Sequence, residues 1–453
     1  MTREISKVIQ TTRFKSDAPT DGFDTVSSHR ALVLGGSSGN QFRKGLIGKV
    51  IESSSTRSML DHSVWLDLGF PHVIGIFGTR GSGKSFDLGV LAECALIPED
   101  TVSTGSDLDG GVIIFDIQDQ FWTLGWEPRP DLDEDKDQIA DLDAWRMKAN
   151  KVNNVDLWLP AGCNFPSGGT KELMISPEQL KSEDWLALLE LERYSPQGQA
   201  LLHLVNLYPN RIPTDLAAKC QPAQLPNFQT PTIEALRWRL EALEGARIIG
   251  SNGINIEQML RTNRVSVLLL RELSDELRAL VVGVITRIVA DKMGQMHKMK
   301  RISRRTGASL DKQPVLPNRV WLIIDEAHSV APSEGTTAAT QPLISYVKRG
   351  RDAGLSLIFA TQQPSAVDRR LMSQVDLTIT HRLGFESDLS AALARMPTMS
   401  SGMYTTSGGR SLGNGDLIRT LRTGEAIIAD SNSPRTVMIK LRPRVSAHGG
   451  NTP

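Results

Sequence analysis

Two short segments of the sequence carry residue types that together could bind and cleave a nucleoside triphosphate. The first matches the phosphate-binding loop pattern and consists of Gly78, Thr79, Arg80, Gly81, Ser82, Gly83, Lys84 and Ser85. Glycines let backbone N–H groups wrap a polyphosphate, and the helix expected after the loop adds a favourable dipole. In this pattern the lysine reaches the β- and γ-phosphates, and the next hydroxyl ligates Mg²⁺. We therefore expect ATP at residues 78–85, with Lys84 on the phosphates and Ser85 on the metal.

The second segment is an apolar run, VWLII at 320–324, that ends in the carboxylates Asp325 and Glu326. Ligands bind at the carboxyl ends of the strands in parallel sheets, so this pair is expected beside the loop. An aspartate here holds Mg²⁺ through water, and a following glutamate polarises the attacking water as a general base. The pair predicts hydrolysis of ATP rather than binding alone. A solvated acidic pair at a strand end is the alternative interpretation, but it does not account for the five apolar residues before it.

Apolar runs elsewhere predict the parallel strands that would position these two segments. The runs VIGIF at 73–77 and VIIF at 112–115 flank a helical pattern over 85–96, which is typical of a βαβ unit. Three further strands are predicted at 264–270, 320–324 and 355–360, and two late strands at EAIIAD and RTVMIKL. Helices are expected after Ser274 and Asp275, which could cap one, and over 341–353. The pattern is that of an α/β fold whose nucleotide-binding core is split in sequence.

Changes in the pattern of apolar, turn-forming and charged residues divide the chain into five parts. Residues 1–70 alternate short β-rich runs with turn residues, as a small barrel or sheet would, and 71–127 hold the first part of the core with the P-loop. Residues 128–261 carry acidic, Pro-rich loops and amphipathic helix patterns, which indicate a helical insertion. Residues 262–445 hold the second part of the core, and 446–453 form a tail.

The bulk composition restricts the setting but not the partner. Fifty-one basic residues balance fifty-one acidic ones, so overall charge does not indicate nucleic-acid binding. The cysteines Cys94, Cys163 and Cys220 lack Cys-x-x-Cys spacing, which argues against a disulfide framework and a zinc site. We expect a reducing, cytoplasmic setting. The first residues show no signal peptide, and no run of about 18 apolar residues predicts a membrane span.

The order of segments after residue 320 resembles a known family. IIDEAHSVAP is followed by YVKRGRDAGLSLIFATQQPSAVDRRLMSQVDLTITHRL, then by GEAIIADSNSPRTVMIKLRPR, and a His-Gly-Gly stands at 448–450. This series resembles the HerA branch of the HerA–FtsK superfamily across essentially the whole chain. The resemblance implies a RecA-like P-loop NTPase core with a β-barrel-like N-terminal module, forming a homohexameric ring that threads double-stranded DNA with ATP bound between subunits. The string DEAH at 325–328 is shared with DEAH helicases, but their two nucleotide motifs lie much closer together.

The resemblance also assigns roles to three residues outside the two motifs. Gln362, which ends the run LSLIFAT, matches the family's polar sensor of the γ-phosphate; a strand-end cap is the alternative. Arg351 falls at a conserved arginine that could reach a neighbouring subunit's γ-phosphate, although a charged solvent face on the helix at 341–353 competes. Asp116 matches the first aspartate of a segment that borders the nucleotide; a turn-forming aspartate is the alternative.

The sequence departs from the family pattern at three places. The segment from Asp116 to Phe121 keeps the first aspartate and the aromatic residue but loses the middle. The arginine that the family places just before the P-loop is replaced by His72 or a neighbour, and Gln363 stands where an arginine is usual. The resemblance therefore does not assign the arginine that acts in trans, and Arg80 inside the loop is a candidate to compensate.

The densest basic run contains Lys298, Lys300, Arg301, Arg304 and Arg305 and is expected in a polar connection between a helix and the strand at 320–324. Such a loop could project into a ring channel and contact DNA phosphates; a solvated loop without function is the alternative.

Two functions from different classes remain open. The first is a DNA translocase working with a partner nuclease in DNA processing or antiphage defence, since no nuclease constellation stands out in this chain. The second is an ATP-gated scaffold that assembles and licenses a partner effector. A signalling NTPase that merely switches is weaker, because Glu326 argues against slow turnover.

Overall fold

A single large mixed sheet organises the fold in this computed structural model. The residues described are 23–26, 29–36, 43–51, 62–98, 102–104, 109–166, 168–243, 247–307, 316–396, 404–405, 411–432 and 435–449. In spatial order the strands of the sheet are β1 (Phe23–Val26), β2 (His29–Leu34), β4 (Ser63–Asp67), β3 (Lys44–Val50), β17 (Arg435–Leu441), β16 (Glu425–Asp430), β13 (Leu377–Thr380), β5 (Val73–Phe77), β12 (Leu355–Thr361), β11 (Arg319–Ile324), β7 (Gly110–Asp116), β10 (Arg264–Leu269), β8 (Val155–Pro160) and β9 (Lys171–Leu173). The short β6 (Ser103–Thr104) pairs with β3.

The part of the sheet from β13 to β9 is parallel throughout. Its central strands are buried on both faces, which explains why they read in sequence as continuous apolar runs rather than as alternating ones. All carboxyl ends of these strands meet at one edge, where Phe77 pairs with Thr361 and Ile324 with Phe359. The α/β fold class and the strand predictions from 73 onwards are confirmed.

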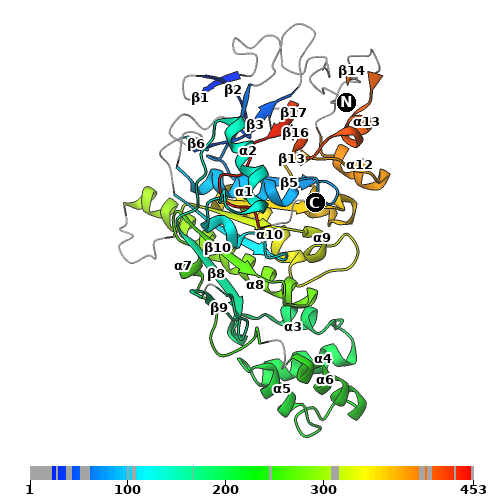
Figure 1. Cartoon of the computed structure of the whole chain (residues 1–453). Coiled ribbons are helices and arrows are strands. Elements are labelled where there is room, and N and C mark those ends of the chain that lie inside the picture. The colour runs from blue at the N-terminus through cyan, green and yellow to red at the C-terminus, as the bar shows by residue number, and fades with distance from the viewer. Residues whose placement is uncertain are drawn as a thin grey trace.

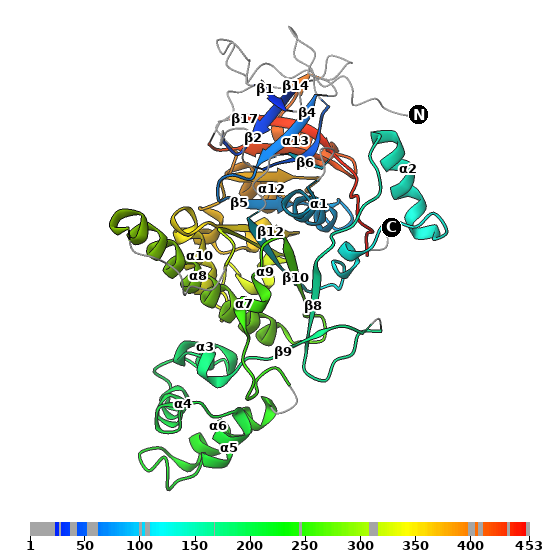
Figure 2. The same cartoon turned by 90° about the vertical axis from the view of Figure 1, so that its left-hand side faces the viewer.

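Helices cover both faces of the parallel strands, and alternate residues of each strand face opposite layers (Figures 1 and 2). In β7, Val112 and Ile114 belong to one apolar cluster with α1 (Lys84–Leu96) and α2 (Lys136–Trp145). Ile113 and Phe115 belong to the opposite cluster with α8 (Asp275–Thr306) and α10 (Thr340–Ala353). The nucleotide loop therefore joins a central strand to a helix on a single face.

The remaining elements are short or lie outside the two helical layers. They are α3 (Ser182–Leu188), α4 (Pro196–Leu207), α5 (Pro213–Lys219), α6 (Thr230–Ala242), α7 (Ile256–Met259), α9 (Ala327–Val330), α11 (Arg369–Met372), α12 (Glu386–Leu393), α13 (Asn414–Thr420) and the two-stranded pair β14 (Tyr404–Thr405) and β15 (Ser411–Leu412). In the described chain, no helix is both long enough and apolar enough to cross a bilayer.

The N-terminal strands continue the main sheet instead of forming a sheet of their own. The described part of residues 1–70 is β-rich, as predicted, but β3 pairs antiparallel with β17, so β1–β4 extend the central sheet. The sequence predicted a small barrel or sheet here but not its pairing with β17, because hydropathy alone does not say which edge a strand joins. The boundary at 70 stays a prediction.

The insertion at 128–261 is only partly helical. Within it, β8 pairs with β10 and carries β9, so both strands extend the core sheet. Helices α3–α6 form the lobe at the bottom of Figure 1. This lobe is tied to the core by Arg287 of α8, which donates to the Asp184 carboxylate at 2.6 Å and to the carbonyl of Gln179 at 2.8 Å.

The C-terminal segment is buried against α1 through a cluster of charges. Arg442 donates to the Glu93 carboxylate at 2.7 Å, and the Ser446 backbone N–H donates to the other oxygen at 2.9 Å. Arg442, Arg444, Glu93 and Ser446 are all fully buried. The first residue of the predicted tail, Ser446, is therefore part of the core. Residues 450–453 of the tail lie outside the described residues.

Candidate nucleotide site

The loop at 78–83 follows β5 directly and requires glycine at three positions. A Cβ on Gly78 would lie 2.4 Å from the Ser82 hydroxyl oxygen and 2.8 Å from the Cβ of His381. Gly81 and Gly83 have φ angles of 72° and 114°, in the left-handed region that side chains disfavour. The backbone can therefore turn tightly into α1 only with these residue types.

The basic and hydroxyl side chains of the loop meet the carboxylate at the end of β11. The Ser85 hydroxyl donates to Asp325 at 2.8 Å, and the Lys84 ammonium donates to the carbonyl of Thr79 at 3.1 Å. Burial lowers the pKa of Lys84, against the opposing charges of Glu326 and Asp325. Burial also raises the pKa of Asp325, and the charge of Glu326 raises it further. A cation between Ser85 and Asp325 would relieve this unfavourable desolvation.

Glu326 is held in an uncommon backbone conformation by its surroundings. Its φ of 52° places it in the left-handed region, which costs a non-glycine residue on the order of 1–3 kcal/mol. One carboxylate oxygen, Oε1, accepts a hydrogen bond from the side-chain amide of Gln362 at 2.5 Å. Nδ1 of His328 lies 3.4 Å from the other oxygen, Oε2, and 3.1 Å from the Thr361 hydroxyl. The two adjacent strand ends, β11 and β12, thus supply a carboxylate and the amide that orients it.

Three buried polar atoms around the loop lack a hydrogen-bond partner in the described structure: the hydroxyls of Thr79 and Ser82 and Oε2 of Glu326. Buried polar atoms are nearly always satisfied, so atoms left unpaired at one place indicate an absent ligand. With the glycine-lined turn and the Ser85–Asp325 pair, they fit a triphosphate and Mg²⁺.

Comparisons with known proteins show the family and the fold of this chain. The sequence matches the family "Helicase HerA, central domain" over residues 46–289, more than half of the chain. The chain belongs to this HerA family. A DNA double-strand break repair helicase HerA of Sulfurisphaera tokodaii is 22% identical over 370 residues, which are 81% of this chain and 64% of that protein. A probable helicase of Methanocaldococcus jannaschii is 23% identical over 48% of this chain and 37% of its own length. The chain therefore spans less than two thirds of these relatives.

Two solved structures share the fold at 14% sequence identity. VirB4 of Thermoanaerobacter pseudethanolicus covers 90% of this chain with 97% of its own, at a TM-score of 0.52. The plasmid coupling protein TrwB, bound to a non-hydrolysable ATP analogue, covers 92% with 98% of its own, also at 0.52. The chain thus has the RecA-like fold of P-loop ATPases.

Asp116 lies at the nucleotide edge of this HerA-family core, but its carboxylate is engaged by its own turn. It accepts backbone N–H groups of Gln118 at 3.2 Å, Gln120 at 3.1 Å and Phe121 at 2.8 Å. Burial raises its pKa to about 7, although these bonds act in the opposite direction. The geometry is that of the turn-forming alternative. We therefore propose that Asp116 affects nucleotide binding only indirectly, by holding the turn between Asp116 and Phe121.

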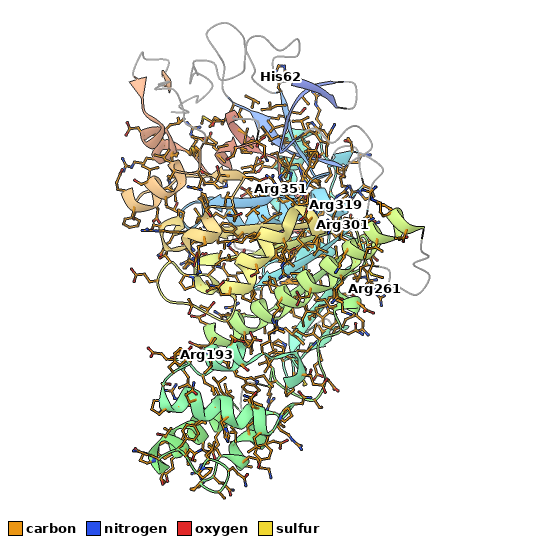
Figure 3. The ribbon with its side chains drawn as sticks, turned by 180° about the vertical axis from the view of Figure 1, so that it is seen from behind. His62, Arg193, Arg261, Arg301, Arg319 and Arg351 are labelled. Atoms are coloured by element: carbon orange, nitrogen blue, oxygen red, sulfur yellow. The ribbon has the colours of Figure 1, made fainter. Side chains whose placement is uncertain are left out.

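Arg351 lies at the opposite edge of the sheet from the nucleotide loop. It precedes β12, whose carboxyl end borders the P-loop, and the strand between is roughly 20 Å long at about 3.3 Å per residue. Arg351 is exposed (Figure 3). Arg349 is also exposed and forms an ion pair with Asp291 at 3.1 Å. Within one chain Arg351 cannot reach the site, so any role toward nucleotide would act on a neighbouring subunit.

His72, which stands near the family's arginine position, is buried, and its ring nitrogens lie 2.9 Å from Asp376 Oδ2 and from the carbonyl of Asp67, so its ring is engaged within its own chain. The basic run from 298 to 305 does not form a connecting loop: it makes up the last turns of α8. The prediction of a loop was wrong because the helix continues through these polar residues. Arg80 is exposed at the loop.

A buried pair that was not predicted from the sequence lies behind the loop. His381, just after β13, lies 2.6 Å from the Asp87 carboxylate of α1 through Nε2 and 2.9 Å from the carbonyl of Glu425 through Nδ1. The backbone carbonyl of the next residue, Arg382, accepts the N–H of Thr79 at 2.9 Å. His381 follows a strand of the parallel sheet, and the carboxyl ends of such strands border ligand sites, so its position in the sequence was a signal that could have identified it.

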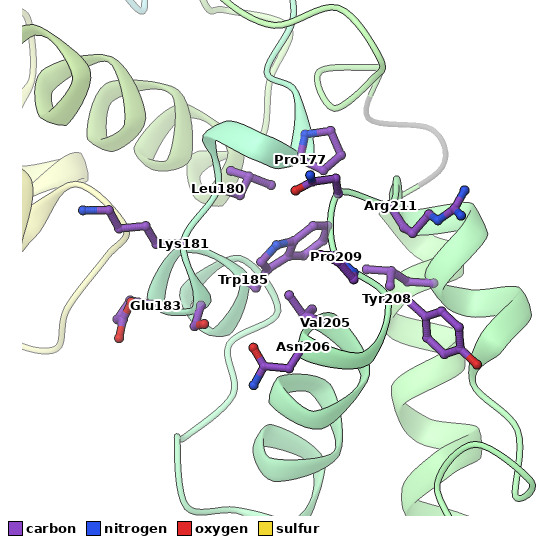
Figure 4. A pocket seen from close by; sticks show the side chains of 13 residues that line it. Pro177, Leu180, Lys181, Glu183, Trp185, Val205, Asn206, Tyr208, Pro209 and Arg211 are labelled. Carbon is purple, nitrogen blue, oxygen red and sulfur yellow. The ribbon is translucent and has the colours of Figure 1, made fainter.

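A cavity of about 410 Å³ lies away from the nucleotide site, in the helical lobe (Figure 4). Lys181, Trp185, Tyr208 and Arg211 are among the residues that line it. Its polar groups are engaged within the lobe: Tyr208 donates to Gln224 at 2.5 Å, and Arg211 lies 4.0 Å from Asp215.

Proposed function

We propose that this chain is an ATP-hydrolysing motor subunit that moves double-stranded DNA as a homohexameric ring. The observation that carries this proposal is the constellation at three adjacent strand ends: Ser85 on Asp325 after β5 and β11, and Gln362 on Glu326 after β12. A switch protein that only binds nucleotide needs no oriented general base.

The residues divide the work at the site. Backbone N–H groups of 79–85 and Lys84 would hold the phosphates, and Ser85 and Asp325 would hold Mg²⁺, which neutralises charge on the phosphate oxygens when bound. Gln362 donates to one oxygen of Glu326, and the other oxygen, Oε2, which accepts no hydrogen bond in the described structure, would accept a proton from the attacking water. Gln362 would sense loss of the γ-phosphate through this shared carboxylate.

Arg351 would complete the site of a neighbouring subunit, a role that its exposed position far from its own loop supports. The DNA contact of Lys298, Lys300, Arg301, Arg304 and Arg305 remains a prediction. A partner nuclease or effector and a cytoplasmic location are also proposals.

The deciding experiment is steady-state ATP hydrolysis with and without linear duplex DNA. We expect DNA to stimulate hydrolysis, and Glu326→Gln to lower it by roughly 10²–10⁴-fold, the usual contribution of a general base. Glu326→Gln should still bind ATP, which a thermal-shift titration measures. Hydrolysis that DNA leaves unchanged would contradict the motor.

A ring scaffold gated by ATP is the second candidate. It is favoured by the engagement of His72 in the fold and by Gln363, which leave two family arginine positions without an arginine. Hydrolysis that responds to a purified partner protein but not to DNA would support it.

A further inference from the structure

The last turns of α8 leave the body of the protein. The helix buries apolar residues as far as Met296, and both His297 and Lys300 bond to Asn318, which precedes β11. Residues 298–306 continue for roughly 13 Å, at about 1.5 Å per residue. Figure 2 shows this end of α8 projecting at the left of the molecule.

This free end combines positive charge with exposed apolar side chains. Lys298, Arg301, Arg304 and Arg305 are exposed, and the sequence from 292 to 306 contains no acidic residue. Met299 and Ile302 are 39% and 42% exposed. Cations in a last turn stabilise a helix terminus, but that does not account for Lys298, Arg301 or the apolar residues. Phosphate contacts need only cations, so the mixed surface favours a protein partner.

A surface of opposite character lies on the other side of the same chain. Segment 127–143 has exposed carboxylates at Glu127, Asp131, Asp133, Glu134, Asp137, Asp141 and Asp143. Its only two cations, Arg129 and Lys136, already pair with Asp131 and Asp133.

An exposed tryptophan belongs to this acidic surface. Trp126 is 54% exposed, and its backbone carbonyl accepts the N–H of Ala447 at 2.9 Å. Gln138 of α2 donates to the carbonyls of Arg444 and Ser446 at 2.8 Å. The same C-terminal segment therefore holds Trp126 and α2 together, so this surface offers an apolar group among carboxylates.

The two surfaces lie on opposite sides of the molecule and cannot meet within one chain (Figure 2). We propose that residues 298–306 of α8 dock on residues 126–143 of a second copy of this chain, an inference that rests on the proposed ring. A contact between two different surfaces is head-to-tail, and repeated contacts of this kind form a ring when the rotation between copies closes and a filament when it does not. Arg301 lies near the start of β11 and Arg351 near the start of β12, and these two strands are neighbours in the sheet (Figure 3). Docking of α8 would therefore bring Arg351 toward α1 of the next copy.

A charge swap tests the contact. Arg301→Glu/Arg305→Glu reverses one face of α8, and Asp137→Arg/Asp141→Arg reverses one face of α2. Each double variant should weaken subunit association by roughly tenfold or more at low salt, because like charges then oppose each other. The chain carrying all four changes should recover assembly. Sedimentation velocity of the full chain with ATP and Mg²⁺ measures the assembly state.

The control is Arg193→Glu/Arg237→Glu, which reverses two exposed charges of the helical lobe and should leave assembly unchanged. Double variants that assemble like the wild type would overturn the contact while leaving the proposed motor intact. If the Arg301→Glu/Arg305→Glu variant assembles but no longer binds duplex DNA, the basic end of α8 is a DNA contact instead. A failure of the fourfold variant to recover would also overturn it. A wild-type chain that stays monomeric would overturn both the contact and the proposed ring.

Discussion

At the scale of single residues, Glu326 shows how the site combines strain with orientation. A left-handed backbone and the Gln362 amide orient its carboxylate at the end of β11. Such strain is maintained only where the surrounding structure enforces it, and it concentrates at functional sites.

Gln362→Ala tests this orientation. Without the amide, Glu326 should sample positions that do not face the attacking water, and kcat should fall by on the order of a hundredfold, as about 1 Å of misplacement can cause. KM for ATP should change little, because Gln362 does not touch the loop that holds the phosphates. Gln363→Ala, at the exposed neighbour, serves as the control; equal loss in both variants would sink a specific role for Gln362.

At the scale of elements, the connection from β4 into β5 depends on a buried histidine. His72 lies between the carbonyl of Asp67 and the Asp376 carboxylate that precedes β13. Burial lowers the pKa of His72, but the hydrogen bond and the charge of Asp376 outweigh burial and raise it above its ordinary value of 6.5. The ring of His72 therefore joins two neighbouring parts of the sheet.

This shift predicts a pH-dependent stability. Because the folded-state pKa of His72 is raised, its contribution is fully present below pH 6.5 and is lost as pH rises through the folded-state pKa. The Tm of the wild type should fall over that window more steeply than the Tm of His72→Gln, as thermal unfolding at a series of pH values would measure. Parallel curves for the two proteins would exclude His72 as the cause.

At the scale of the whole molecule, the nucleotide loop and Arg351 lie at opposite edges of one sheet. In the proposed ring, the loop of one copy and Arg351 of the next would together complete one site. In the proposed contact, the basic end of α8 lies on the same side of the molecule as Arg351, and the acidic surface lies on the side of α1 and the nucleotide loop. One head-to-tail arrangement would therefore bring both pairs together between the same two copies.

Mixing inactive variants tests this arrangement. Lys84→Ala should lose ATP binding, and Arg351→Ala should bind ATP but hydrolyse it roughly 10³-fold more slowly, as expected when an arginine acting in trans is removed. Mixed rings contain interfaces in which an intact loop faces an intact arginine, so hydrolysis should recover part of the wild-type rate. The absence of recovery, with mixed assembly shown by native mass spectrometry, would place the role of Arg351 within its own chain or outside catalysis.

The sequence by itself determined the parallel core and the residues of the two motifs. Those strands are buried on both faces, so each reads as an apolar run, and a loop that wraps phosphate restricts which residue types can stand at 78–85. Tertiary structure alone decided where distant segments meet. The pairing of β3 with β17, the strained Glu326, the pair of His381 with Asp87 and the placement of Arg351 all depend on contacts between residues far apart in the chain. Local periodicity carries no information about such contacts, which is also why the basic turns of α8 read as a loop.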